Sequence, residues 1–269
     1  MRNAQSTARF ATITAPGNIW VVSSINGDAQ RLRQIHAGID ARLTRQDTVI
    51  YLGNYYGPHP KVLETVQELI KFRKHFLSQP RTFADQIIYL RGQREDMWEK
   101  LLQLQFSTNP KEALSFMVEN DIGTVLDAYG SSVDEALERL RLSLVELTHY
   151  TLRLRSNIRM NPGHYEFMSL FKRAAMTADQ KLLFVHAGLD PSLPMDRQGD
   201  NFWWGHRDFV AMERQYEGFR RIIAGHSAYK EGLQQYPVAT ILDNGSGIDG
   251  TLMAACMDAN GNVLDLIEA

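Results

Sequence analysis

The sequence predicts an α/β protein built on a sheet whose early strands are parallel, and two patterns in the chain lead to this prediction. The first pattern is a set of apolar runs that are rich in Ile, Val and aromatic residues and do not alternate with polar residues. Such runs are typical of strands that are buried on both faces. Each run ends at glycine or another small residue, and the five runs cover residues 18–24, 47–53, 86–92, 181–188 and 220–226.

The second pattern is the helical spacing of apolar residues between the first three runs. Residues 28–43 and 60–77 show this spacing, and Pro60 suits the first turn of a helix. The order is therefore β-α-β-α-β, which implies parallel strands joined by right-handed crossovers.

The middle of the chain, residues 94–177, is predicted to be a long and almost wholly helical insertion. Ser132 and Glu135 form a capping box that opens one of its helices. Apolar residues then recur at steps of three and four, which we interpret as a stripe that packs against neighbouring helices. The stripe consists of Val133, Leu137, Leu140, Leu144 and Leu147.

The two ends of the chain have different patterns. Residues 238–244, 250–258 and 262–268 read as further strands, and Asn260-Gly261 suits the tip of a hairpin between the last two. Residues 1–15 lack a continuous apolar core, so we expect a flexible tail and no secretory signal there. The remaining residues, 16–269, are predicted to form a single domain.

Composition excludes some classes of protein. The 269 residues carry a net charge of −2, so there is no overall positive field to attract nucleic acid. The single cysteine, Cys256, cannot form an internal disulfide, which fits a reducing compartment. No apolar run approaches the roughly 20 residues needed to cross a bilayer. We therefore expect a cytoplasmic protein with neither a membrane nor a nucleic acid as partner.

Polar side chains follow each of the five apolar runs. In open α/β sheets, ligands bind beyond the carboxyl ends of the strands, so these side chains are expected to line one pocket. It would hold two imidazoles, several amides, a hydroxyl and two guanidinium groups. The main candidates are Ser24, Asn26, Asn54, Arg91, Gln93, Arg94, His186 and His226.

The turns also carry a family resemblance. The segment PGNIWVVSSINGDAQRL resembles the opening of calcineurin-like metallophosphoesterases, usually PGxIxxIGDIHG, especially in their bacterial serine/threonine protein phosphatase branch. VIYLGNYYGPHP is similar to the signature VxxLGDYVDRGP, IIYLRGQREDM to LRGNHEDM, LLFVHAGLDPSLP to the fourth signature, and IIAGHSAY to VxGHTP. The resemblance runs in order from about Ala15 to the C-terminus. It implies a metallophosphoesterase-like β-sandwich with βαβαβ units, flanking helices and a helical cap insertion.

The resemblance further implies a centre of two metal ions, and this sequence departs from it at the first ion. Active members bind that ion with an aspartate and a histidine of the first signature and a bridging aspartate of the second. The matching positions are Ser24, Asn26 and Asn54, none of which is a carboxylate. The histidine that acts as general acid in the family is matched by Arg94, whose proton is not released near neutral pH.

The positions implied for the second ion are partly kept. They are Asn54, Gln93, His186 and His226, so two imidazoles remain and the anionic ligand is lost. Two histidines and two amides make a neutral and weak site. We therefore expect no cofactor, or at most one weakly bound divalent ion such as Mn or Zn.

The same substitutions suggest a different ligand. They keep the size and polarity of the turns and delete negative charge, while two arginines add positive charge. We therefore expect Arg91, Arg94, Asn26 and Asn54 to attract an anion without a metal.

The preferred hypothesis is a pseudophosphatase that binds a protein or a phosphorylated ligand in a regulatory or scaffolding role. One alternative is an active metal-dependent serine/threonine phosphatase or phosphoesterase with a single ion at His186 and His226. Another is a sensor of a small molecule such as a nucleotide. Arg91 also has a purely structural alternative, which is an ion pair with Glu95 or Asp96 on the adjacent turn.

Overall fold

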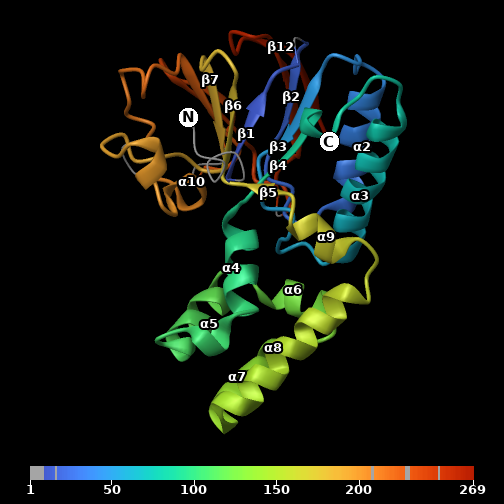
Figure 1. The fold of residues 1–269 in the computed structure, drawn as a ribbon, viewed down its shortest axis with the longest axis vertical. Helices are drawn as coiled ribbons and strands as arrows, with labels where there is room; N and C mark the ends of the chain where they lie inside the picture. The colour runs from blue at the N-terminus through green and yellow to red at the C-terminus, as the bar shows by residue number, and fades with distance from the viewer. Residues whose placement is uncertain (1–8, 16, 207–208, 228–230, 248) are drawn as a thin grey trace.

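The structure is a computed structural model that describes residues 9–15, 17–206, 209–227, 231–247 and 249–269, and within them two six-stranded sheets are stacked (Figure 1). The first sheet has the strand order β12-β11-β2-β3-β4-β5. Neighbours from β2 to β5 are parallel, whereas β11 is antiparallel to β2 and to β12. The strands are β2 (Ile19–Val22), β3 (Thr48–Tyr51), β4 (Ile87–Leu90), β5 (Phe171–Lys172), β11 (Met253–Met257) and β12 (Val263–Glu268).

The second sheet has the order β1-β6-β7-β8-β10-β9. Its central strands β7, β8 and β10 are parallel, so their carboxyl ends lie at one edge. β1 is parallel to β6, and the pairs β6–β7 and β9–β10 are antiparallel. The strands are β1 (Phe10–Ile13), β6 (Ala174–Thr177), β7 (Leu182–Val185), β8 (Arg221–Ala224), β9 (Gly232–Gln235) and β10 (Ala239–Asp243).

The strands of the five apolar runs, β2, β3, β4, β7 and β8, are almost entirely buried on both faces, as the runs predict. In β2, Ile19 and Val21 belong to the apolar cluster between the two sheets. Trp20 and Val22 point to the other side, because successive side chains of a strand alternate in direction, and they join a cluster with the helices outside the sheet. Burial of one such side chain contributes about 1.5–3 kcal/mol.

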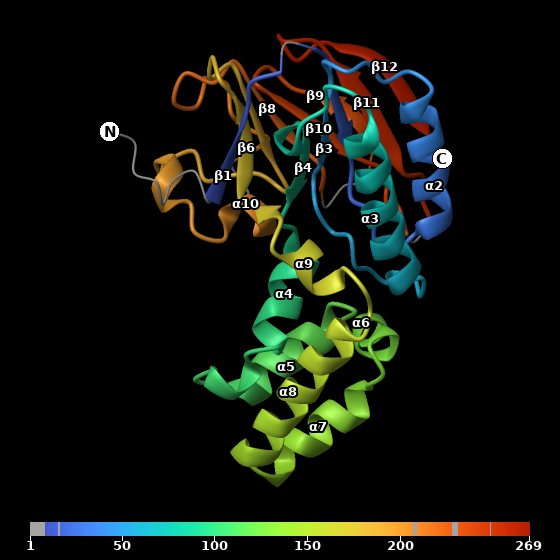
Figure 2. The ribbon, with the colours of Figure 1, turned by 45° about the vertical axis from the view of Figure 1, so that its right-hand side comes forward.

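Helices cover the outer face of the first sheet, whereas a short helix and loops pack on that of the second (Figure 2). The first sheet is covered by α2 and α3, and α2 begins where the side chain of Asp28 accepts a hydrogen bond from the Arg31 N–H at 3.1 Å. A short helix, α10, lies on the side of the second sheet. These helices and the nearby 3₁₀ turns are α2 (Ala29–Asp40), α3 (Val62–Ser78), η1 (Ala84–Gln86), η3 (Met195–Arg197) and α10 (Asn201–Trp204).

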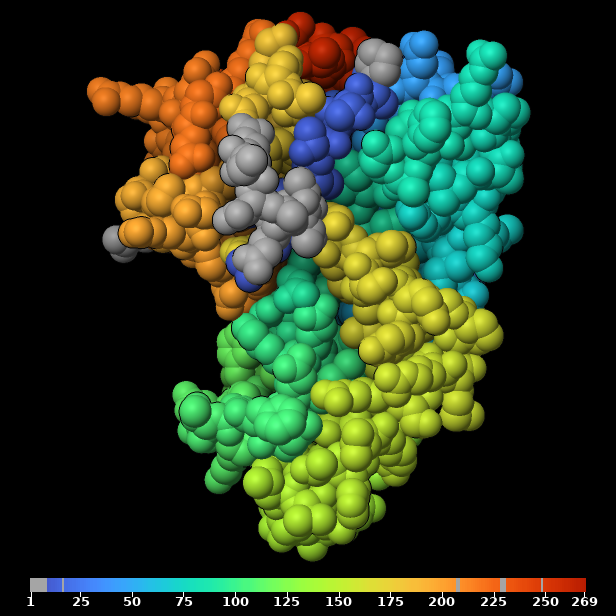
Figure 3. Space-filling model, in the orientation of Figure 1, coloured from blue at the N-terminus to red at the C-terminus, as the bar shows by residue number. Residues whose placement is uncertain are grey.

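The predicted insertion projects from the sandwich as a helical lobe (Figures 1 and 3). Ser132 caps α7 by accepting a hydrogen bond from the Glu135 N–H at 3.2 Å, which confirms the predicted helix start. Leu147 is buried and Leu144 is exposed, so the predicted apolar stripe is only partly covered. The lobe contains α4 (Gln93–Leu101), η2 (Leu104–Phe106), α5 (Pro110–Glu119), α6 (Gly123–Ala128), α7 (Val133–Leu142), α8 (Leu144–Arg159) and α9 (His164–Met168).

Two predicted boundaries are wrong. Residues 10–13 are not part of a tail, because they form β1 and pair with β6. The end of the predicted helical stretch 94–177 is also extended, since residues 171–172 and 174–177 form β5 and β6. The five apolar runs, the two helices between them and the three C-terminal strands are confirmed. Within the described ranges, no helix is both long and apolar enough to cross a bilayer.

Candidate functional site

The carboxyl ends of strands from both sheets meet, as predicted, and short hydrogen bonds join the turns that follow them. The hydroxyl of Ser24, after β2, donates to the carbonyl oxygen of Gly225, after β8, at 2.8 Å. The Nδ1–H of His186, after β7, donates to the carbonyl oxygen of Leu52, after β3, at 2.6 Å. The two sheets therefore bring four of the predicted strand ends together.

Two glycines allow the turns to approach this closely. Gly53 has φ +104°, and a Cβ atom there would lie 2.7 Å from the Gly92 nitrogen and 2.9 Å from Nδ1 of His186. A Cβ atom on Gly225 would lie 2.4 Å from the Cβ atom of Leu52. Larger residues at either position would push the strand ends apart.

Asn26 and Asn54 adopt left-handed backbone conformations, with φ of 55° and 53°. Asparagine tolerates this region better than most residues, so both substitutions suit their turns. The Asn26 side chain donates to the Ser246 carbonyl oxygen at 2.9 Å. Its Oδ1 atom accepts from Nε of Arg94 at 3.3 Å, and Oδ1 of Asn54 accepts from the Arg94 backbone N–H at 3.1 Å.

Glu95, in the first turn of α4, holds the turn that contains Asn54. Its buried carboxylate accepts hydrogen bonds from the N–H groups of Asn54, Gly92 and Tyr55 at 2.8 Å and of Tyr56 at 3.3 Å. Burial raises the pKa of Glu95 to about 7, and the four N–H groups oppose this rise because they favour the charged form. Both oxygens of this carboxylate are therefore occupied by hydrogen bonds from the backbone of the turns.

His186 and His226 stack with their rings nearly parallel and their centroids 5.2 Å apart. Because His186 Nδ1–H donates to a carbonyl oxygen, its Nε2 atom is an acceptor, and among the described residues nothing donates to it. Burial lowers the pKa of His186 well below its usual value, and the nearby His226 and Arg94 lower it further. The site thus contains a neutral imidazole with a buried lone pair.

Arg94 links the turn after β2 to the helical insertion. Besides its bond to Asn26, its guanidinium donates to the Asn120 carbonyl oxygen at 3.0 Å and lies 3.4 Å from Oδ2 of Asp121. Only 14% of its side chain is exposed. Burial lowers the pKa of Arg94 and Asp121 opposes the change, but an arginine stays protonated in proteins. A fixed positive charge therefore lies beside Asn26.

The structure places Arg91 elsewhere, which corrects the expectation that it lines the anion site. Its guanidinium is paired with Glu99 and lies 3.7 Å from a carboxylate oxygen of Asp96, and it stacks over the ring of Trp203 at 5.5 Å. The structural alternative named Glu95 or Asp96 as the partner; the structure shows the contact with Asp96 and, in place of Glu95, a pair with Glu99. Gln93 begins α4 and is half-buried.

The prediction from strand ends omitted Asp243 and the loop of Asn120 and Asp121. Asp243 ends β10 and accepts hydrogen bonds from backbone N–H groups of residues 227 and 245 at 2.8 and 3.0 Å. Its Oδ2 atom is also 3.1 Å from Nδ1 of His226, in a geometry that makes no hydrogen bond. The strand-end rule applied to residues 238–244 would have found Asp243. No local pattern marks Asp121, which reaches Arg94 only through the folding of the insertion.

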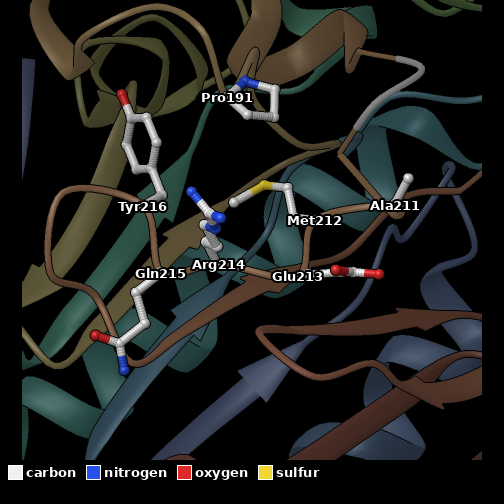
Figure 4. A pocket seen from close by; sticks show the side chains of 7 residues that line it. All are labelled: Pro191, Ala211, Met212, Glu213, Arg214, Gln215 and Tyr216. Atoms are coloured by element: carbon white, nitrogen blue, oxygen red, sulfur yellow. The ribbon is translucent and has the colours of Figure 1, made fainter.

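A separate cavity of about 360 Å³ lies away from the predicted site residues (Figure 4). None of the predicted site residues lines it. One continuous loop segment and a proline supply its walls, which are Pro191, Ala211, Met212, Glu213, Arg214, Gln215 and Tyr216.

Solved structures of similar fold include several phosphatases. A protein described as a diadenosine tetraphosphatase aligns over 97% of this chain and 98% of its own, with a TM-score of 0.59 and 18% identity. A metallophosphoesterase from Sphaerobacter thermophilus aligns over 94% and 88%, with a TM-score of 0.48 and 12% identity. A serine/threonine phosphatase from Saccharomyces cerevisiae aligns over 95% and 80%, with a TM-score of 0.45 and 13% identity. No protein-family model and no curated protein matches the sequence.

The chain therefore has the calcineurin-like metallophosphoesterase fold, as the sequence motifs implied.

The pair of metal ions that the sequence resemblance implies does not fit the donors found here. Ser24 uses its hydroxyl on a carbonyl oxygen, and the neutral amide oxygens of Asn26 and Asn54 both accept hydrogen bonds from Arg94. In the part of the chain that the structure describes, no group of three or more His, Cys, Asp or Glu residues is placed to hold a metal ion. For a single ion, Nε2 of His186 is a suitable ligand. The other predicted ligands of that ion, Asn54, Gln93 and His226, carry no negative charge.

Proposed function

We propose that this chain is a pseudophosphatase: a catalytically degenerate protein of metallophosphoesterase fold that binds a phosphorylated ligand, free or on a protein, in a regulatory or scaffolding role. The observation that carries this proposal is the position of Arg94. Its Nε and backbone N–H engage the amide oxygens of Asn26 and Asn54, at 3.3 and 3.1 Å. A metal ion at these oxygens would meet the like charge of the guanidinium.

The charge that repels a cation favours a phosphate. Phosphoryl oxygens accept charge-assisted hydrogen bonds from guanidinium groups, and the side chains of Ser24, Asn26 and Asn54 add no negative charge to oppose them.

The buried Cys256 supports a reducing, cytoplasmic location for the protein.

Phosphate binding can be tested without any metal. Titration of inorganic phosphate in chelator-treated buffer should raise the melting temperature of the wild-type protein. Arg94→Gln should abolish the rise, because it removes the only charge proposed to bind the anion. A flat melting temperature for the wild type would contradict phosphate binding.

The loss of catalysis has its own test. Elemental analysis of the purified protein should find no stoichiometric metal, and an aryl phosphate with added manganese should not be hydrolysed. Stoichiometric metal together with turnover would overturn the proposal.

A variant that carries the family's metal ligands tests why metal binding and catalysis were lost. The combined changes Ser24→Asp, Asn26→His, Asn54→Asp and Arg94→His return the family's ligands and acid. In this structure the carboxylate introduced by Ser24→Asp would face the carbonyl oxygen of Gly225, to which the Ser24 hydroxyl now donates. Without metal the variant should therefore be less stable than the wild type, and manganese should raise its melting temperature and not that of the wild type. No response of the variant to manganese would mean that the missing charges are not the cause.

A second candidate function is a phosphoesterase that uses one metal ion. It is favoured by one observation: Nδ1–H of His186 donates to a backbone carbonyl, which orients Nε2 as metal-binding histidines are oriented. This function predicts that zinc or manganese stabilises the wild type and that His186→Ala removes the effect. Equal melting temperatures with and without these ions would exclude it.

A further inference from the structure

The loop between α5 and α6 brings a carboxylate to the proposed anion site. Asp121, in this loop, lies 3.4 Å from the Arg94 guanidinium, and the Asn120 carbonyl oxygen accepts from the same guanidinium at 3.0 Å. Among the described residues, Asp121 is the one carboxylate paired with Arg94. The neighbouring Glu95 is not available, since four backbone N–H groups occupy its oxygens.

The contact with Asp121 is of a kind that a phosphate can replace. The Asp121 side chain is 56% exposed, so water already solvates much of its charge. Its distance to Arg94 is longer than the roughly 2.7–2.9 Å typical of strong charge-assisted hydrogen bonds. A phosphate that binds Arg94 at the shorter distance would compete with Asp121 for the same N–H groups.

A second contact holds the first turn of α6, which directly follows this loop, against the turns of the site. The hydroxyl of Thr124 donates to the carbonyl oxygen of Gly57 at 2.5 Å and also contacts the carbonyl oxygen of Asp121 at 3.2 Å. Gly57 is packed against Asn26, because a Cβ atom on it would lie 2.0 Å from the Asn26 carbonyl carbon. Displacement of Asp121 would therefore alter how residues 120–124 rest on the turns of the site.

We infer that Asp121 is an internal competitor for the anion site, so that binding of a phosphate-bearing ligand to Arg94 releases the α5–α6 loop from the sandwich. This inference rests on the proposed phosphate binding, and it adds that ligand binding and the position of the insertion are coupled. By linkage, weakening the loop contact must tighten the ligand by the same factor.

The test is calorimetric titration of inorganic phosphate into the full chain in metal-free buffer. Asp121→Asn should bind phosphate about two- to fivefold more tightly than the wild type, the factor that corresponds to a partly exposed ion pair. Asp127→Asn is the matched control, because it removes the same charge from an exposed position in α6. It should leave the affinity unchanged.

Hydrogen exchange provides the second measurement. Phosphate should speed exchange at the amides of residues 120–124 in the wild type, and the Asp121→Asn protein should show faster exchange there before phosphate is added. Phosphate binding that is equal in wild type and Asp121→Asn, with unchanged exchange at 120–124, would overturn the inference and leave the proposed function standing. Binding that is measurable only in Asp121→Asn would support the inference. Absence of phosphate binding in both proteins would overturn the proposed anion site and the inference with it.

Discussion

Two buried histidines occupy contrasting surroundings. His36, on α2, is bonded at both ring nitrogens: Nδ1–H donates to Glu68 at 2.7 Å, and Nε2 accepts from the Tyr51 hydroxyl at 2.8 Å. It also stacks on Phe72, with ring centroids 4.0 Å apart. His186, at the strand ends, uses Nδ1–H on a carbonyl oxygen, and its Nε2 has no donor within the described part of the chain.

The difference separates a structural histidine from a candidate ligand-binding one. A buried polar atom without a partner costs free energy, so it is rare where a residue serves only the fold. Both ring nitrogens of His36 have hydrogen-bond partners within the protein. Nε2 of His186 is instead an acceptor that a ligand or an ion could bind. The predictions for these two histidines test this contrast, and a last one concerns the Arg94–Asp121 pair.

The largest effect is expected from His36→Leu. This change leaves the buried Tyr51 hydroxyl without an acceptor and removes the donor to Glu68, so the free energy of unfolding should fall by about 2–4 kcal/mol. Urea denaturation measures the loss. His75→Gln, at an exposed site where the histidine lies 2.9 Å from Asp40, is the control and should cost less than about 1 kcal/mol.

The acid side of the stability curve should show the next largest effect. Burial lowers the pKa of both His36 and His186 below 6.5, so the unfolded chain binds protons that the folded chain does not. The contribution of these two histidines to the free energy of unfolding should therefore fall as the pH drops below about 6.5. Glu95 contributes in the opposite direction, because its pKa is raised to about 7 in the folded chain, so the test compares each histidine variant with the wild type. Glu68 opposes the lowered pKa of His36, whereas Arg94 and His226 reinforce that of His186.

Consequently, His186→Leu should flatten the pH dependence between about pH 6.5 and 4.5 more than His36→Leu does. Urea denaturation of both variants and the wild type at a series of pH values measures this. Equal slopes in the two variants would contradict the contrast.

At neutral pH, His186→Leu should cost much less than the change at His36. The Leu52 carbonyl oxygen loses one hydrogen bond, worth about 0.5–1.5 kcal/mol, and removal of the unpartnered nitrogen offsets part of the loss. Urea denaturation of His186→Leu, His36→Leu and the wild type at neutral pH measures the difference. A loss as large as that of His36→Leu would show that Nε2 of His186 is stabilised in the free protein.

The smallest effect on stability is expected from Asp121→Asn. Because its carboxylate is more than half exposed, the pair with Arg94 should contribute at most about 1 kcal/mol. Thermal unfolding at low and high salt measures it, since screening should weaken the pair in the wild type and leave the variant unaffected. A much larger loss would mean that the loop cannot be displaced by a ligand.

The strand ends could be predicted because apolar runs and the residues after them are local features. Ser24 and Asn54 follow parallel neighbours of the first sheet, so their sequence positions place them at the same edge. His186 follows β7 of the second sheet, and it meets them only because the two sheets stack with these edges together. The same reasoning missed β1, because four residues at a sheet edge give little apolar signal and their partner strand is far away in the chain.

The directions of the two arginines could not be predicted. Arg91 and Arg94 are three residues apart, yet one turns to Glu99 and the other to Asp121. The partners of Arg91 lie on α4, which directly follows it, and a pair with Asp96 was one of the alternatives that the sequence left open. Asp121 reaches Arg94 only through the folding of the insertion, and no spacing within residues 91–94 encodes that. The anion site therefore contains one arginine where the sequence suggested two.

The insertion leaves the first sheet after β4 and returns in β5, and these strands are parallel neighbours. Its two junctions are adjacent, since the Arg91 N–H donates to the Lys172 carbonyl oxygen at 2.8 Å. Helices can thus be added, lost or exchanged between the junctions without changing the order of the sandwich strands. The size of the lobe is therefore not constrained by the strand order of the sheet from which it projects.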